Sequence, residues 1–102
     1  MARPIKRKLI EGIPNYTVFG PIDKRPKDDK VIIMKIEEYE TIRLIDFKGL
    51  AQQECADIMD VSRTTVQKLY NDARAKVSTS LVLGLKLKIA GGDFDIKKVS
   101  SD

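Results

Sequence analysis

The most distinctive chemistry in this 102-residue chain lies in a group of hydrogen-bonding side chains between positions 62 and 74. Gln and Asn can each form two hydrogen bonds with adenine, Lys can donate to guanine, and a Thr methyl group can contact thymine. Arg, Ser and Thr side chains also suit contacts with phosphate groups. The candidate DNA-binding residues are Ser62, Arg63, Thr64, Thr65, Gln67, Lys68, Asn71 and Arg74.

Helical periodicity places these residues on one predicted helix, whose recognition segment covers about residues 63–77. Ser62 can accept a hydrogen bond from a free N–H of the first turn, and Gly84 can end the helix. At ~100° per residue, an apolar arc faces the core and a polar arc faces outward. The core arc comprises Val66, Leu69, Tyr70, Ala73 and Val77; the reading arc comprises Thr64, Gln67, Lys68 and Asn71, flanked by Arg63, Thr65 and Arg74.

A second predicted helix, Gln52–Met59, comes just before and should pack against the first. A helix-turn-helix requires a small residue where its helices approach, and Ala56 fits, with Val61, Val66 and Leu69 following it by 5, 10 and 13 positions. Asp60 stands where the turn often has Gly, and Asp tolerates the left-handed conformation. The two-helix pattern therefore predicts a DNA-reading unit. The polar arc alone would equally suit an ordinary surface helix.

The elements that position this unit begin with an irregular segment, because all four prolines fall within residues 1–30. This segment starts with a basic arm, Arg3–Lys8, for which two interpretations stay open. The arm could contact DNA phosphates or the minor groove, or Ile5 and Leu9 could join a small sheet, and we favour the strand. We expect one compact domain, with the arm and loop at 1–30 and the helix-turn-helix domain at 31–102.

Patterns elsewhere predict a strand at Lys30–Met34, a helix at Ile36–Phe47 ended by Gly49, and strands at Leu85–Ile89 and Phe94–Lys97. Gly91-Gly92 between the last two strands predicts a hairpin turn. The expected fold class is therefore mainly α with a small β element: a helix-turn-helix, a short N-terminal strand and a C-terminal hairpin. Three acidic residues, Glu37, Glu38 and Glu40, should form a solvated first turn that suits the helix dipole.

Composition limits the function classes. The net charge is only +4, but residues 1–30 and 62–102 each carry +4 while 31–61 carry −4, which suits contact with a polyanion through selected surfaces. The chain has no His and one Cys, Cys55, which we interpret as a small buried residue and not as a redox sensor. We therefore expect no enzyme, no cofactor and no metal cluster. No apolar run approaches a membrane span, so we expect a cytoplasmic protein without membrane contact.

The chain also resembles a known family over most of its length. The residues that carry the resemblance are Arg3-Pro4, Phe19–Pro21, Glu38–Asp46, Gly49-Leu50, Gln52, Glu54–Ala56, Val61–Gln67 and Gly91–Phe94. It is similar to uncharacterised protein family 0251 (domain of unknown function 134), small predicted DNA-binding proteins of bacteria and archaea. Their helix-turn-helix is similar to region 4 of the major sigma factors, of winged-helix type. The resemblance implies DNA binding and transcription regulation, and no catalytic activity.

The chain departs from the family pattern where the first helix of the pair begins. Ala51 and Gln53 stand where Thr and Glu are usual. That Thr would cap the helix and that Glu would close a capping box, so their loss should cost on the order of 1 kcal/mol. Some members carry cysteines near the N-terminus, where this chain has Lys8–Gly12, so metal sensing is not expected here.

Two function classes stay open at this stage. The first is a sequence-specific regulator of double-stranded DNA, which could bind two half-sites as a homodimer. The alternative is a protein-interaction module that docks on RNA polymerase or another transcription protein. That alternative rests on the similarity to sigma region 4 and on the acidic turn of the helix at Ile36–Phe47.

Overall fold

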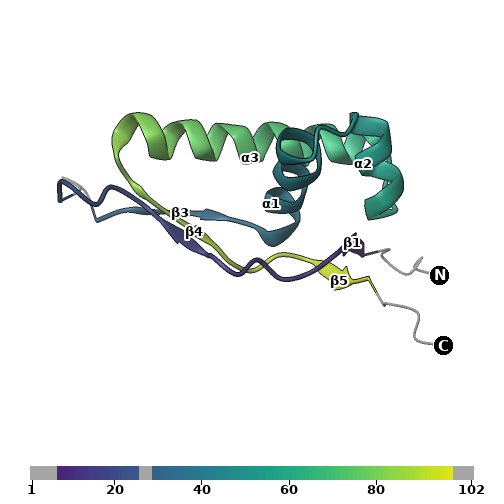
Figure 1. Ribbon diagram of the computed structural model, residues 1–102, viewed down its shortest axis with the longest axis horizontal. Coiled ribbons are helices and arrows are strands. Elements are labelled where there is room, and N and C mark those ends of the chain that lie inside the picture. The colour runs from purple at the N-terminus through teal and green to yellow at the C-terminus, as the bar shows by residue number, and fades with distance from the viewer. Residues whose placement is uncertain (1–6, 26–28, 98–102) are drawn as a thin grey trace, which may run out of the picture.

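The computed structural model of the chain describes residues 7–25 and 29–97. Three helices lie over two small sheets, and the longest helix runs along the top of the molecule (Figure 1). The fold is therefore mainly α with a small β element, as predicted. The elements are β1 (Lys8–Ile10), β2 (Val18–Phe19), β3 (Val31–Met34), α1 (Ile36–Ile42), η1 (Arg43–Phe47), α2 (Gln52–Met59), α3 (Arg63–Leu83), β4 (Lys86–Ile89) and β5 (Phe94–Ile96).

The predicted C-terminal hairpin is wrong. Strand β4 lies in the centre of a three-stranded sheet, parallel to β3 and antiparallel to β2, whereas β5 pairs in parallel with β1. Gly91 and Gly92 do have positive φ angles, but the segment between β4 and β5 passes alongside the start of α1, where Ile36 N–H donates to the Gly91 carbonyl. Alternating apolar residues identified both strands, but they do not encode which strand is the partner.

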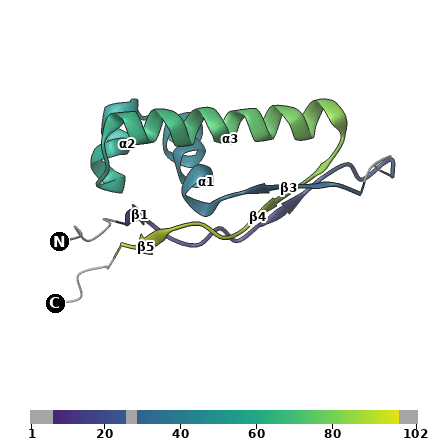
Figure 2. The same ribbon diagram turned by 180° about the vertical axis from the view of Figure 1, so that it is seen from behind.

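The N-terminal segment is part of the same unit, because β1 and β2 both pair with strands of the C-terminal tail. Lys8 of the basic arm and Leu9 after it lie in β1, in agreement with the strand interpretation of the arm. Ile5 lies outside the described residues, as does most of the arm. The first strand and the last strand therefore lie side by side below the helices (Figure 2).

The core consists of two buried clusters, one at each half of α3. The first joins α3 to η1 and α2 and contains Leu44, Cys55, Ala56, Met59, Val66 and Leu69. The second fills the space between α3 and the three-stranded sheet and contains Met34, Ala73, Leu87 and Ile89. Cys55 is fully buried, as expected, and burial raises the pKa of its thiol to about 11.

The predicted helix at Ile36–Phe47 has the expected bounds but changes its winding. Its last five residues form the π-helical turn η1, and Lys48 N–H donates to the Arg43 carbonyl five residues earlier. Gly49 follows with φ of 76°, as expected for a glycine that ends a helix. The wider turn leaves Asp46 and Phe47 exposed on one flank of the molecule.

Helix α3 has the length that the sequence predicted and extends over the three-stranded sheet (Figure 1). Gly84 ends it in the left-handed conformation, with φ of 66°. The N-terminal half packs on α2, whereas the C-terminal half carries three exposed apolar residues, Leu81, Val82 and Leu83. Within the described residues, none of the helices combines the length and apolarity needed to cross a bilayer.

Candidate nucleic-acid interface

Helices α2 and α3 are joined by a three-residue turn, and we call this part the α2–turn–α3 unit. Asp60 ends α2 in the left-handed conformation, with φ of 56° and ψ of 47°, as its position in the turn predicted. Val61 N–H then donates to the Ala56 carbonyl at 3.0 Å, which closes the turn. Ala56 is fully buried in the cluster between the helices, so a larger side chain there would separate them.

The start of α3 is capped as the sequence predicted. The Ser62 hydroxyl accepts a hydrogen bond from Thr65 N–H at 3.1 Å, and the two hydroxyl oxygens lie 2.9 Å apart. Arg63 and Thr64 are exposed in the first turn. The structure therefore gives Ser62 and Thr65 a capping role and leaves Arg63 and Thr64 directed at solvent.

The four residues of the reading arc, Thr64, Gln67, Lys68 and Asn71, are all exposed. In the core arc, Val66, Leu69 and Ala73 are buried, and Tyr70 and Val77 are half-buried. The side chains of Thr64, Gln67 and Asn71 form no hydrogen bond with any other described residue. Lys68 forms an exposed ion pair with Asp72 at 3.0 Å, one turn along the helix. Such pairs contribute little, so Lys68 can exchange this partner for another anion.

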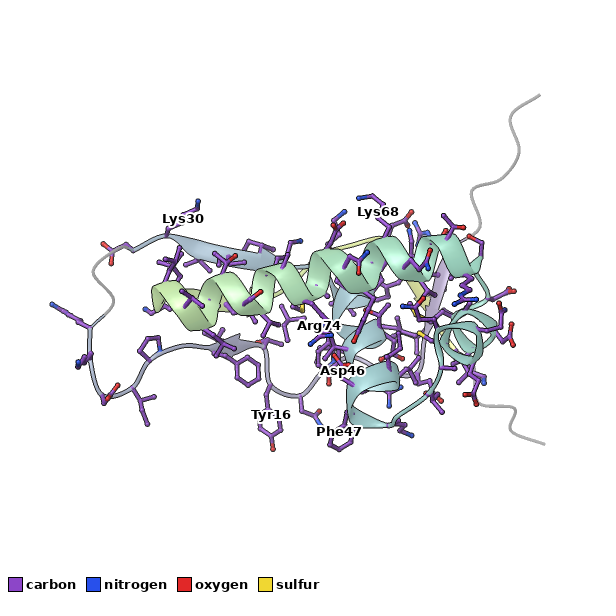
Figure 3. All side chains as sticks on the ribbon, turned by 90° about the horizontal axis from the view of Figure 1, so that it is seen from above. Tyr16, Lys30, Asp46, Phe47, Lys68 and Arg74 are labelled. Carbon is purple, nitrogen blue, oxygen red and sulfur yellow. The ribbon has the colours of Figure 1, made fainter. Side chains whose placement is uncertain are left out.

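Arg74 lies apart from the reading arc. Its Nη1 donates to the Tyr70 hydroxyl at 3.1 Å, and the Tyr70 hydroxyl donates to Asp46 Oδ1 at 2.6 Å. The hydrogen bond with Asp46 raises the pKa of Tyr70 above its usual value. Figure 3 shows Arg74 and Asp46 on one flank of α3, whereas Lys68 points to the other. Sequence periodicity placed Arg74 beside the arc but could not show that its partner, the Tyr70 hydroxyl, is bound to Asp46 of η1.

The expected solvated acidic turn is wrong. Glu37, Glu38 and Glu40 are only 1–2% exposed, because β1, α3 and the segment around Gly92 cover the start of α1. The Glu38 carboxylate accepts hydrogen bonds from Lys76 Nζ at 2.6 Å and from the Lys35 backbone at 2.8 Å. The acidic surface on which the RNA polymerase alternative rested is therefore absent.

The buried Glu40 belongs to a partly exposed network that fixes the segment after β1. Its carboxylate accepts from Arg43 Nε at 2.7 Å and from Glu11 N–H at 2.9 Å, and Arg43 Nη2 also donates to the Glu11 carboxylate at 2.6 Å. The hydrogen bond with Glu40 raises the pKa of Arg43 above its usual value. The hydrogen bond from Arg43 lowers the pKa of Glu11. All these carboxylates serve packing, and within the described residues no group of His, Cys, Asp and Glu is arranged to hold a metal.

The start of α2 retains part of a capping box despite Ala51. The Ala51 N–H donates to Glu54 Oε1 at 3.0 Å, so the glutamate of the box stands at position 54. The expectation that Gln53 removes that glutamate is therefore wrong. Gln53 instead donates to Asp57 at 2.9 Å, and only the side-chain cap is missing at Ala51.

Sequence reasoning missed Lys35 and did not place Lys8 of the basic arm beside the reading arc. A hollow of about 340 Å³ lies along α3, and its lining includes three lysines, Lys8, Lys35 and Lys68. Three carboxylates, Glu37, Glu38 and Asp72, also line it and are paired with Lys8, Lys76 and Lys68. Lys35 is exposed and stands immediately before α1, whereas Lys8 is half-buried in β1. The three ammonium groups come from segments far apart in the chain, so no local sequence pattern could have grouped them.

Comparisons with known proteins agree with the family resemblance. The model of the family described as "Protein of unknown function DUF134" matches residues 1–97. The UPF0251 protein of Desulfitobacterium hafniense (strain Y51) is 47% identical over 94 residues, which cover 92% of this chain and 75% of the relative. That of Halothermothrix orenii is 42% identical over 99 residues, 97% of this chain and 73% of the relative. No solved structure matches the chain.

Proposed function

This chain belongs to the DUF134 family of proteins of unknown function, and we propose that it binds double-stranded DNA sequence-specifically and regulates transcription. Helix α3 enters the major groove, and α2 supports it. The observation that carries the proposal is the exposed reading arc at the start of a capped helix that is fixed to a second helix by a tight turn. A rigid helix with free hydrogen-bonding groups is what base recognition requires.

The reading arc supports base recognition because the side chains of Thr64, Gln67 and Asn71 form no hydrogen bond with another described residue and are therefore available to bases. Gln67 and Asn71 are exposed, one turn apart on the same side of α3, and either can form two hydrogen bonds with adenine. Lys68 can donate to guanine once it leaves Asp72. Thr64 lies one turn earlier and presents both a hydroxyl and a methyl group.

Contacts with phosphate come from the surroundings of the arc. Arg63 is exposed at the first turn of α3, where free N–H groups also favour anions. Lys35 is exposed and lines the same hollow as Lys68, where it can meet a phosphate, whereas Lys8 is half-buried and paired with Glu37 at 4.0 Å. A DNA strand beside α3 would meet both Arg63 and Lys35, which would fix the register of the helix in the groove.

Selection of bound sequences from a random DNA library tests the proposal, followed by anisotropy titration of the selected and scrambled duplexes. We expect a preferred sequence that is bound at least ~10³-fold more tightly than scrambled DNA. The double variant Lys68→Ala/Asn71→Ala should lose most of this preference. The matched control is Thr79→Ala, which removes an exposed side chain from the same helix beyond the reading arc. Salt-dependent binding without any sequence preference would contradict the proposal.

A further inference from the structure

The flank of α3 opposite Lys68 carries an exposed apolar surface that the proposed DNA contacts do not use (Figure 3). We call it the apolar flank and define it by Tyr16, Phe19, Phe47 and Leu81, which are 49–83% exposed. Figure 3 shows Tyr16 and Phe47 projecting from this same side of the molecule. Two hollows of about 490 and 390 Å³ border it, and Leu81 lines both of them.

Such a surface is unfavourable in water unless another molecule covers it. Each large aromatic side chain buries about 150–250 Å² when fully covered, so covering these four side chains removes roughly 500 Å² of apolar surface. A standard interface buries about 800 Å² on each partner. With the polar residues at its margin, the apolar flank is therefore large enough for one side of a stable interface.

The charged side chains within the apolar flank indicate which kind of partner covers it. Asp46 and Arg74 both line the larger hollow and are linked only through the Tyr70 hydroxyl. The guanidinium has no other hydrogen bond to a described residue, and Asp46 uses only Oδ1. One surface thus offers a guanidinium and a carboxylate that each keep hydrogen-bonding capacity for a partner. A twofold axis would bring Arg74 of each molecule to Asp46 of the other.

We propose that the apolar flank binds a second copy of this chain in a twofold dimer. Leu81 of each copy enters the hollow beside Val77 in the other, and two Asp46–Arg74 pairs form between the copies. The proposal does not depend on DNA binding, but it is compatible with it. Lys68 points away from the flank, so both reading arcs stay uncovered (Figure 3).

Sedimentation equilibrium without DNA tests the interface on the full chain. We expect a monomer–dimer equilibrium whose dissociation constant rises at least about tenfold in Leu81→Asp and in Arg74→Asp. The double swap Asp46→Arg/Arg74→Asp should restore dimerisation to near the wild-type value, because a twofold interface exchanges both charges. Circular dichroism confirms that each variant is folded. The control is Ile22→Asp, which adds the same charge at a fully exposed apolar residue outside the flank.

Three results would overturn the proposal. The first is a chain that stays monomeric at about 1 mM. The second is a dimer that Leu81→Asp leaves intact. The third is a double swap that dimerises no better than Arg74→Asp. None of these results bears on whether the monomer reads DNA, because Leu81 lies outside the reading arc.

Discussion

The Glu37 carboxylate occupies the space beside Gly92, so a methyl group added at position 92 would overlap Glu37 Oε1. The other carboxylate oxygen accepts a hydrogen bond from Asp93 N–H at 3.0 Å. Gly92 also has φ of 116°, a backbone conformation that residues with a side chain rarely adopt. This contact fixes the segment before β5 against the start of α1.

Gly92→Ala should therefore destabilise the fold by about 2 kcal/mol or more, because it combines backbone strain with a steric clash against a buried side chain. Denaturant unfolding, followed by circular dichroism, measures the free energy of unfolding. Gly12→Ala serves as the control, because nothing lies within 4 Å of the added methyl group and its φ is not positive. Equal stability of the two variants would contradict the packing described for Glu37.

Acid stability should depend on Glu11. In the folded state the hydrogen bond from Arg43 lowers the pKa of Glu11 below its usual 4.5. The ionised group thus stabilises the fold above its unfolded pKa, and this contribution disappears as the pH falls through the lowered value. Glu11→Gln should lower the denaturation midpoint at pH 7 slightly and flatten its fall between pH 5 and pH 3. Identical profiles for the two proteins would argue against the ion pair.

The Cys55 thiol should be inert in the native protein. Burial raises its pKa from 9.0 to about 11, so at pH 8 the folded protein holds almost no thiolate. A disulfide reagent should label it slowly in buffer and quickly in denaturant, as absorbance of the released thiol shows. Because the unfolded thiol ionises first, stability should also fall above about pH 9. Fast labelling in buffer would support a redox role instead.

A substitution at Ala51 should supply the side-chain cap that the start of α2 lacks. Ala51 is exposed and has φ of −70° and ψ of 158°, the conformation of a helix N-cap. In Ala51→Thr a hydroxyl can accept from the first turn, while Glu54 keeps its hydrogen bond, so we expect about 0.5–1 kcal/mol of added stability. Thermal unfolding measures the gain. Ala51→Val, which has the same shape without the hydroxyl, should show no gain.

Lys35 should contribute affinity without contributing sequence preference. If it meets a phosphate, Lys35→Ala weakens binding to selected and scrambled duplexes by the same factor and reduces the salt slope by about 0.9. Anisotropy titrations at several salt concentrations measure both quantities. Lys86→Ala is the control, since Lys86 is exposed on a strand away from the reading arc. A change confined to the selected sequence would assign Lys35 to base recognition.

The parts of the fold that could be predicted from the sequence are those that neighbouring residues determine. The start and end of α3 are set by the Ser62 cap and by Gly84, and Asp60 ends α2, so each boundary depends on neighbouring residues. The buried state of Glu38 depends on Lys76, which lies 38 residues away, and the partner of β5 lies at the other end of the chain. Long-range contacts of this kind leave no periodic pattern.

The residues of the candidate site also differ in whether local sequence signals could predict them. The reading arc could be derived because exposure on a helix follows from its period. The hydrogen bonds that link Arg74 through Tyr70 to Asp46 involve another element, η1, and could not be derived in this way. The π-helical turn that exposes Phe47 was also not predictable, because one additional residue in a turn changes the helical period only locally.

The parallel pairing of β1 with β5 also governs the order of folding. Lys8 pairs with Phe94, so the second sheet can close only after 86 further residues have been synthesised. The α2–turn–α3 unit depends on contacts close in sequence and ends at Leu83, before β5 begins at Phe94. The helices that we propose to read DNA can therefore assemble without the pairing of β1 with β5, which closes the sheet beneath them.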